Sequence, residues 1–389
     1  MKQIIEISGF LALKEIWRNR SRFLLVSLVI ALITLLVLFI AALGEGLGNG
    51  NKEYIAKLDA ELIAYQSKSD FLIAASRLSK DRLAAIRRVE GVADVGMLGT
   101  ANATLILPGD VEPLKVALLG VQPGHTGEPA VVQGQQLGTD LSDEVIIDKN
   151  TALRSDLKIG DDLTIRVTQG TQDEFYTLRI VGISDGQQYS LQPSVFVPFY
   201  TWDRIKPKSE AEINSSNPVA NVILIKLVDP AAIEEVSASI VSQVNNVETA
   251  TLKQAINALP GYSAQQSTLN LQGGFTLFIG VLVIGGFFQI QILQKVAQIG
   301  VLKAIGTSNP IVAMASILQI AVVTIVGVAI GGFMTFLFSL SFPPTVPIVF
   351  NGTTTAIAVI ALLLIGPLSG LISTRYAVRI EPLKALGLS

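Results

Sequence analysis

Few side chains in this chain of 389 residues could do chemistry. There is no cysteine, and the single histidine, His125, lies in the sequence Gly124-His-Thr-Gly127. The lack of thiols excludes disulfides, Fe–S clusters and thiolate zinc sites, and a single imidazole argues against a multi-histidine metal site or a Ser-His triad. We therefore expect no catalytic residue and no metal. We interpret His125 as an ordinary loop residue, with metal or haem ligation as the lesser alternative.

Two motifs that mark nucleotide hydrolysis and metalloproteases are absent. No Gly-x-x-x-x-Gly-Lys-Ser/Thr phosphate loop and no His-Glu-x-x-His sequence occurs. The acidic pairs Asp143/Glu144 and Asp161/Asp162 are typical of solvated turns rather than of catalysis. The sequence therefore predicts a protein that is not an enzyme and has no cofactor of its own.

One short polar segment, residues 295–310, stands between two long apolar runs. Ile299, Val301, Leu302 and Ile305 predict an apolar stripe on a short helix. The sequence from Gly306 to Pro310 then ends that helix and starts the next one. Such a helix at a membrane face suits the docking of a cytoplasmic partner, and the alternative is an interfacial turn with no partner.

The composition indicates a membrane protein. Half of the residues are hydrophobic (50%), the mean hydropathy is +0.53, and the formal net charge of −2 gives no sign of a nucleic-acid partner. About 20 apolar residues cross a bilayer. We expect four transmembrane helices, all without charge, at residues 23–43, 273–294, 311–340 and 353–374. Because intramembrane charges usually mark ion paths, their absence argues against ion-coupled transport, so energy would arrive from another subunit.

The flanking segments fit the same arrangement. Residues 1–22 predict an amphipathic helix in the membrane interface, with Phe10 and Trp17 on its apolar face and basic residues before the first span. Residues 341–352 form a short Pro-rich loop, and residues 375–389 form a basic tail.

The polar region between the first two spans, residues 44–272, is large enough to bury its own core. Short strands between Gly, Pro and Asp turns, alternating with a few helices, predict an α+β domain, with helical stalks at its two ends. Strands are expected at residues 61–66, 92–107 (as one strand or two), 114–120, 144–148, 162–168, 175–183, 194–198 and 222–227, with a further strand from residue 246. Helices are expected at 51–60, 79–89 (capped by Ser79), 230–244 and 251–258.

Charge predicts the orientation. Residues 1–22, 295–310 and 375–389 together hold 10 Lys/Arg and 3 Asp/Glu, which leaves 19 basic and 28 acidic residues elsewhere. By the positive-inside rule both termini and the 295–310 loop face the cytoplasm, and residues 44–272 and 341–352 lie outside.

Small residues in the last two spans predict close helix packing. Gly327 and Gly331, and Gly366 and Gly370, have the Gly-x-x-x-Gly spacing. This pattern favours a homodimer, and chance in a Gly-rich sequence is the alternative.

The motif Gln298-Ile-Gly-Val-Leu-Lys-Ala-Ile-Gly-Thr-Ser-Asn309 resembles the segment after the second span in FtsX-like ABC-transporter permeases, the group that includes MacB, LolC and DevC. The segments Ala12–Phe23 and Arg379–Leu386 are similar to motifs of the same family. Many relatives have Glu in place of Gln298, which weakens any salt bridge from this position.

The resemblance implies a MacB-like permease architecture and a homodimer bound to two copies of an ABC ATPase. The ATPase-coupling helix would consist of Gln298, Ile299, Gly300, Val301, Leu302, Lys303, Ala304, Ile305 and Gly306. ATP-driven motion would pass through the stalks to the external domain (mechanotransmission), for export of an amphiphile such as a lipid, lipopeptide, antibiotic or haem. A membrane-fusion adaptor would be a further partner if the cell has an outer membrane.

Two other functions stay open. The same machine could control a cell-wall hydrolase or a sensor kinase without moving a substrate. Alternatively, the chain could be a membrane-anchored adhesion or binding protein with no energy source. Neighbouring genes, or the effect of a charge at Ile305, would separate these hypotheses.

Overall fold

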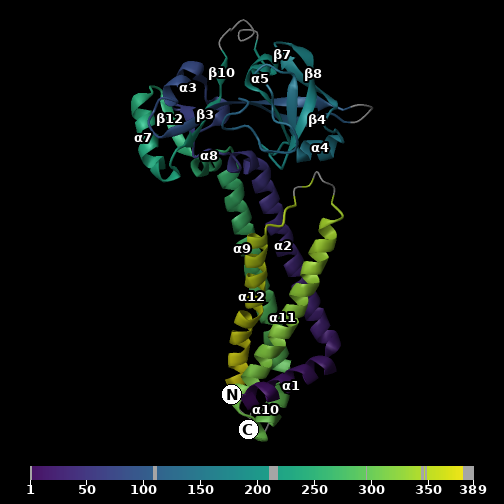
Figure 1. The fold of residues 1–389 in the computed structure, drawn as a ribbon. Helices are drawn as coiled ribbons and strands as arrows, with labels where there is room; N and C mark the ends of the chain where they lie inside the picture. The colour runs from purple at the N-terminus through teal and green to yellow at the C-terminus, as the bar shows by residue number, and fades with distance from the viewer. Residues whose placement is uncertain are drawn as a thin grey trace. The chain divides into compact units, whose positions relative to one another are not determined.

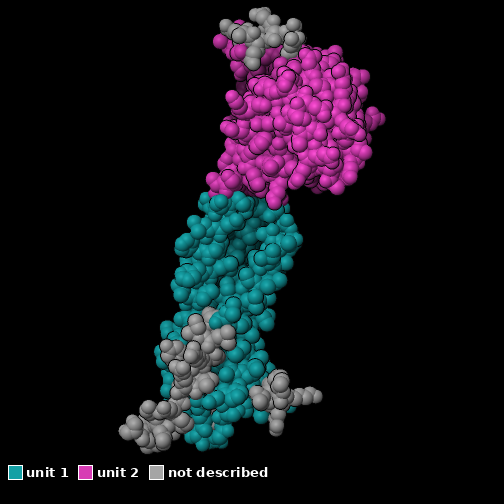
Figure 2. Space-filling model, turned by 90° about the vertical axis from the view of Figure 1, so that its left-hand side faces the viewer, with its two compact units in different colours: residues 1–46, 266–389 teal, residues 47–265 magenta. Residues whose placement is uncertain are grey.

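The computed structural model describes residues 2–107, 112–209, 218–294, 296–342, 346 and 348–379, with backbone only for residues 2–5, 302 and 369–379. The chain divides into two compact units, coloured separately in Figure 2. Unit 1 comprises residues 1–46 and 266–389, and unit 2 comprises residues 47–265.

Unit 1 is helical: its long helices run alongside one another, and α1 and α10 lie at the end of the bundle that holds the N-terminus (Figure 1). Its elements are α1 (Lys2–Arg18), α2 (Arg20–Ala56), α9 (Tyr262–Gln294), α10 (Val296–Ala304), α11 (Asn309–Ser339) and α12 (Gly352–Arg379), with the last part of α2 and the first turn of α9 belonging to unit 2. Within the described residues, α2, α9 and α11 are long and apolar enough to cross a membrane. The fourth expected span falls in α12, where the apolar stretch with described side chains is only Gly352–Leu368. The structure therefore supports three spans, and the fourth stays a prediction.

The larger of the apolar clusters in the described part of unit 1 comes from four helices. Its buried members include Ile30 of α2, Phe288 of α9, Val323 of α11 and Leu362 of α12. On α2 the complementary face, which includes Leu24, Leu28 and Leu32, is about half exposed or more. These helices thus present an apolar outer surface as well as an apolar core, as expected for a membrane bundle.

The predicted packing glycines lie where helices of the same chain meet. A Cβ on Gly327 would come within 2.6 Å of Ile30, and one on Gly331 within 2.5 Å of the Ala31 carbonyl oxygen, both on α2. A Cβ on Gly366 of α12 would approach the Thr324 hydroxyl of α11 to 2.0 Å. The surface of Gly327 and Gly331 is therefore covered by α2, so it cannot also be the surface of a homodimer. For Gly370 the structure describes the backbone alone.

Unit 2 is a mixed β-sheet domain with short helices (Figure 1). The strands of the large sheet run in the order β12-β1-β11-β3-β4-β9-β6-β8-β5, and β7 pairs with β3 and β8; β4/β9 and β6/β8 are parallel. A second sheet pairs β2 with β10. The strands of unit 2 are β1 (Leu62–Gln66), β2 (Leu78–Ser79), β3 (Val92–Ile106), β4 (Leu114–Val121), β5 (Val131–Gly134), β6 (Glu144–Asp148), β7 (Asp162–Gln169), β8 (Gln172–Ser184), β9 (Ser194–Pro198), β10 (Val219–Ala220), β11 (Val222–Leu227) and β12 (Val247–Thr251). Its helices are η1 (Ile73–Ala75), α3 (Lys80–Ile86), α4 (Lys149–Ser155), α5 (Phe199–Ile205), η2 (Pro230–Ala232), α7 (Ile233–Gln243) and α8 (Leu252–Ala258).

Both faces of the sheet are buried, which explains the unbroken apolar runs in its strands. In β11, Ile223 and Ile225 face a core shared with α3, α5 and α7, whereas Val222 and Leu224 face a second core with α8 and the end of α2. Because successive strand side chains point to opposite faces, a strand covered on both sides needs apolar residues at every position.

The strands predicted from these runs are confirmed at β6, β9 and β11 with the same bounds, and β3 is a single strand. Two details of the helices differ. The Ser79 side chain makes no capping hydrogen bond to α3, although Ser79 is the residue before it. Thr251, by contrast, forms a full capping box with Gln254 at the start of α8.

Candidate functional site

The short helix between the second and third long spans is α10, and it is anchored on one side. Ile299 is only 8% exposed and packs with Ile292 of α9 and Val312 of α11. After Ala304 the helix ends where Ile305 N–H donates to the Val301 carbonyl and Gly306 has φ +97°, a conformation that glycine adopts without strain. Pro310 then stands in the first turn of α11, where a missing N–H costs nothing.

The outer side of α10 carries an unpartnered apolar pair. Val301 is 48% exposed and Ile305 is 75% exposed, one turn apart. The single stripe predicted for Ile299, Val301, Leu302 and Ile305 is therefore wrong in one respect, since Ile299 faces the bundle. At about 100° per residue, Ile299 and Val301 point to nearly opposite sides of a helix.

The other residues predicted for the coupling helix are distributed on both sides. Gln298 and Ala304 are exposed, Gly300 is buried and Lys303 is half-buried. The side chain of Leu302 and the whole of Lys295 lie outside the described residues, as does the tail beyond residue 379.

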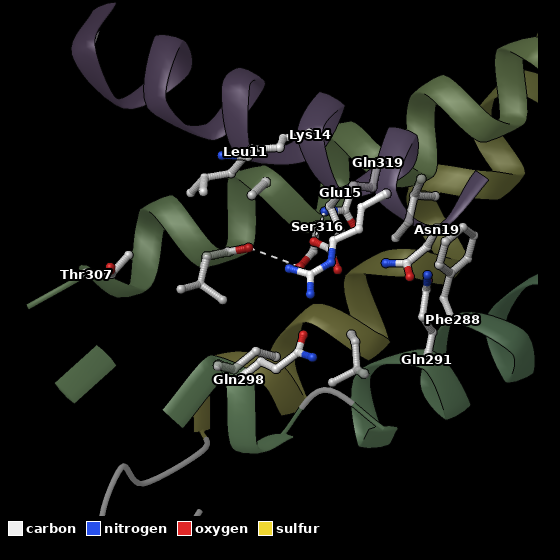
Figure 3. Close-up of a pocket in the computed structure, with 16 residues that line it drawn as sticks. Leu11, Lys14, Glu15, Asn19, Phe288, Gln291, Gln298, Thr307, Ser316 and Gln319 are labelled. Atoms are coloured by element: carbon white, nitrogen blue, oxygen red, sulfur yellow. Dashed lines mark hydrogen bonds between the residues drawn. The ribbon is translucent and has the colours of Figure 1, made fainter. Parts of the chain in front are cut away.

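A pocket of about 360 Å³ lies beside α10, between α1, α9 and α11 (Figure 3). In Figure 3, Glu15, Ser316 and Gln319 lie together on one side of the hollow, and Gln291 and Gln298 lie on the other. The lining residues are Leu11, Lys14, Glu15, Arg18 and Asn19 of α1; Phe288, Gln291 and Ile292 of α9; Gln298 and Ile299 of α10; Thr307; and Val312, Ala315, Ser316, Gln319 and Ile320 of α11.

Polar side chains make this pocket unusual for the interior of an apolar bundle. Gln319, which is 7% exposed, donates from Nε2 to Glu15 Oε2 at 2.6 Å. Gln291 is 4% exposed, and its Nε2 has no hydrogen-bond partner among the described residues. The sequence did not predict this site, because its residues come from separate helices. The available signal was the glutamines within the apolar runs, Gln289 and Gln291 in α9 and Gln319 in α11.

His125 has an ordinary structural role in unit 2. Its Nδ1 lies 2.9 Å from Asp94 Oδ1, and Asp94 Oδ2 accepts hydrogen bonds from the Thr126 N–H and hydroxyl. Burial alone would raise the pKa of Asp94, but the hydrogen bonds from Thr126 and His125 outweigh it and hold the pKa below its ordinary value. The interpretation of His125 as a satisfied loop residue therefore agrees with the geometry.

One sequence resembles the nucleophile turn of serine hydrolases, Gly182-Ile-Ser-Asp-Gly186. Ser184 is fully buried at the end of β8, where it pairs with both β5 and β6. No helix follows it before β9, and the one histidine of the chain is held by Asp94. A substrate could not reach this hydroxyl, so the pattern is structural.

A bundle of long apolar helices, with an exposed short helix between two of them and a separate mixed-sheet unit inserted in the chain between α2 and α9, is typical of a membrane subunit that works with partner proteins. Comparison with protein families identifies the kind of membrane subunit. The family model of the MacB-like periplasmic core domain matches residues 23–243, and that of the FtsX-like permease C-terminal region matches residues 270–382. The chain belongs to the FtsX-like, MacB-type family of ABC-transporter permeases.

Curated relatives match over nearly the full length. The putative hemin transport system permease protein HrtB of Staphylococcus haemolyticus is 24% identical over 377 residues, 97% of this chain and 99% of that protein. The corresponding protein of Staphylococcus epidermidis is 24% identical over 380 residues, with the same coverage.

Among solved structures, the extracellular domain of the ABC-type transporter YknZ from Gram-positive bacteria matches 49% of this chain and 98% of that chain, with 13% identity and a TM-score of 0.35. The periplasmic region of MacB from Actinobacillus actinomycetemcomitans matches 53% of this chain and 92% of that chain, with 11% identity and a TM-score of 0.37.

Proposed function

We propose that this permease subunit couples ATP hydrolysis by two copies of a separate ABC ATPase to motion of unit 2, and so exports or extracts an amphiphile. The observation that carries the proposal is the exposed apolar pair formed by Val301 of α10 and Ile305 just after its end, beside the anchored Ile299. An apolar pair on a helix that is fixed at its other face can fill a groove of a partner and transmit its movement to the spans.

The orientation in this proposal follows from charge. Both termini and α10 face the cytoplasm, unit 2 lies outside, and α12 completes four crossings of the bacterial cytoplasmic membrane. Two helices, α2 and α9, each run from unit 1 into unit 2 and would act as the stalks. The Lys52 ammonium lies 3.3 Å from the Tyr262 hydroxyl, which supports pairing of the two stalks at that level.

The working unit in this proposal is a homodimer. Because α2 covers the Gly327 and Gly331 surface, the second copy would meet a different face. The exposed apolar side of α9, with Phe275, Phe278 and Leu282, is a candidate for that contact. An adaptor of the membrane-fusion type would join only in a cell with an outer membrane.

For the substrate, hemin is the first amphiphile to test, because the curated relatives are described as putative hemin transport permeases. The assay is stimulation of ATPase activity by hemin in the reconstituted complex. If lipids or lipopeptides stimulate and hemin does not, another amphiphile is the substrate. If no amphiphile does, the regulatory alternative, control of a hydrolase or sensor kinase, gains support.

The docking role is tested by Ile305→Asp. A carboxylate in the apolar contact should weaken binding of the ATPase about 30-fold, as the loss of an anchor of about 2 kcal/mol does. Asn309→Asp adds the same charge at the start of α11, where the helix dipole tolerates it, and should bind normally. Co-purification and coupled ATPase rates measure both. Normal coupling in Ile305→Asp would contradict the proposal.

A further inference from the structure

The pocket beside α10 has a cationic rim. Lys14 and Arg18 are one turn apart on α1, both line the pocket and both are exposed. Glu15 is the only acidic residue among the lining residues, so these side chains have a net positive charge. A planar guanidinium at the mouth of a pocket is well suited to a phosphate, which it binds through two parallel hydrogen bonds.

Deeper in the pocket a donor lacks a partner. The Gln291 side chain is buried, and its Nε2 makes no hydrogen bond within the described structure. An unpaired buried donor is costly, so a bound acceptor oxygen would stabilise this arrangement. The neighbouring Gln319 is already paired with Glu15, which leaves Gln291 as the inner donor.

The rest of the wall is apolar. Phe288, Ile292, Val312 and Ile320 line the pocket next to its polar groups. An occupant therefore needs both an anionic, oxygen-rich head and an apolar portion. A small inorganic anion would satisfy the first requirement and leave the apolar wall unfilled.

The exposed face of α1 indicates where the occupant comes from. Phe10 is 64% exposed, Leu13 is 63% exposed and Trp17 is 80% exposed, and they form one stripe on α1. The opposite face packs on α11, where the buried Ser8 donates to the Ile311 carbonyl. A helix with an apolar stripe turned outward and cations at its end lies in a membrane interface, so the mouth of the pocket opens at headgroup level.

We infer that this pocket binds one anionic phospholipid, with its phosphate between Arg18 and Gln291 and an acyl chain along Phe288 and Ile320. The Lys14 ammonium, which lies over the Phe10 ring at 5.5 Å, adds positive charge at the mouth. The lipid contacts α1, α9, α10 and α11, and thereby stabilises the packing of α10 against the other three helices. Basic pockets between helices at the membrane surface bind acidic headgroups in this way. The site is independent of the proposed transport function, because it requires only that α1 lies at the membrane surface.

The experiment measures which lipid lies next to Trp17. The chain has two tryptophans, and a Trp202→Phe background leaves Trp17 as the only emitter. The full-length protein is reconstituted in phosphatidylcholine nanodiscs that contain a minor fraction of brominated phosphatidylglycerol or, in parallel, brominated phosphatidylcholine. We expect local enrichment of phosphatidylglycerol of about fivefold over its bulk fraction, seen as excess quenching. Equal quenching by the two lipids would overturn the inference.

Three variants test whether the pocket causes the enrichment of phosphatidylglycerol. Arg18→Gln and Gln291→Leu should abolish the enrichment, and Gln291→Leu removes an unpaired donor, so it should not impair folding. Arg22→Gln on α2 removes a nearby cation that does not line the pocket, and it should retain most of the enrichment. If Arg22→Gln loses as much as Arg18→Gln, diffuse surface charge explains the effect and the site is refuted.

A final arm separates a lipid from a soluble anion. Inorganic phosphate added to the aqueous phase should leave the enrichment unchanged, because it cannot use the apolar wall. Displacement of the brominated lipid by inorganic phosphate would assign the pocket to a free phosphate and overturn the lipid proposal.

Discussion

Among the single residues of unit 2, Asp94 ties the loop at residues 122–127 to the sheet. Its carboxylate accepts from Thr126 and lies against His125. The loop also passes so close to β3 that a Cβ on Gly96 would lie 1.9 Å from the Thr126 carbonyl oxygen. The two features act together, since glycine permits the close approach and the carboxylate holds it.

The Asp94→Asn variant tests this role through its pH dependence. Because the folded-state pKa of Asp94 lies below its ordinary value of 3.8, the carboxylate contributes stability above that value and loses it as the pH falls through the folded pKa. We expect Asp94→Asn to cost about 1 to 2 kcal/mol at pH 7, with the difference from wild type closing at acid pH. Unfolding in a Trp17→Phe background, followed by the buried Trp202, measures unit 2.

Asp140→Asn is the matched control, since the Asp140 carboxylate has no hydrogen bond or ion pair with the other described residues. It should leave stability unchanged across the same pH range. A constant difference between Asp94→Asn and wild type at every pH would show that the loss is steric rather than electrostatic.

The helices and strands differ in how far they follow from the sequence. Continuous apolar runs such as Val222–Ile225 predict buried strands because both faces of the sheet are covered. The short helices α4 and α5 were not predicted, because their few residues carry too little periodicity and their positions depend on tertiary contacts. Thr151 of α4, for example, is held by a hydrogen bond to the Ser194 carbonyl far along the chain.

The candidate site also has one part that the local sequence predicts and another part that depends on tertiary contacts. Local signals predict α10, since Gly306 and Pro310 bound it in sequence. Which side of α10 is buried depends on Ile292 and Val312 from other helices, and no local pattern gives that. The pocket was missed for the same reason, because Arg18, Gln291 and Gln319 meet only after four helices have packed.

Because α2 packs against α11, the stability cost of replacing a glycine of α11 by alanine depends on whether that glycine faces α2. Gly327→Ala places a Cβ 2.6 Å from Ile30 and 2.9 Å from the Ser27 carbonyl oxygen, and such overpacking costs about 1 to 3 kcal/mol. Gly332 lies in the same helix, but its nearest neighbour, the tip of Leu38, is 4.0 Å away. Gly332→Ala should therefore be neutral or slightly stabilising through helix propensity.

Thermal denaturation of the detergent-solubilised protein distinguishes the two alanine variants. Because both replace glycine by alanine within α11, the change in propensity is the same and the difference in melting temperature isolates the contact with α2. Equal stability of the two variants would show that α2 and α11 separate in the membrane form.

For the whole molecule, the distribution of charge is the main argument for orientation. The uncharged spans give no preference by themselves, and the acidic excess lies in the region that contains unit 2. Positive residues resist translocation, so the basic segments 1–22 and 375–389 are expected on the cytoplasmic side, where an ATPase finds its nucleotide. If this orientation were reversed, α10 would face away from any ATPase, and the coupling proposal would fail with it.

The absence of cysteine from the chain makes this orientation directly measurable. Leu153 on α4 is 64% exposed, and Ser308 just after α10 is also exposed. In cells without an outer barrier and without the partner ATPase, a membrane-impermeant maleimide should label Leu153→Cys at once and Ser308→Cys only after permeabilisation. Labelling of both variants in intact cells would put unit 2 and α10 on one side. That result would require an even number of membrane crossings between unit 2 and α10. The proposed arrangement has a single crossing between them, the α9 span, so the result would contradict it.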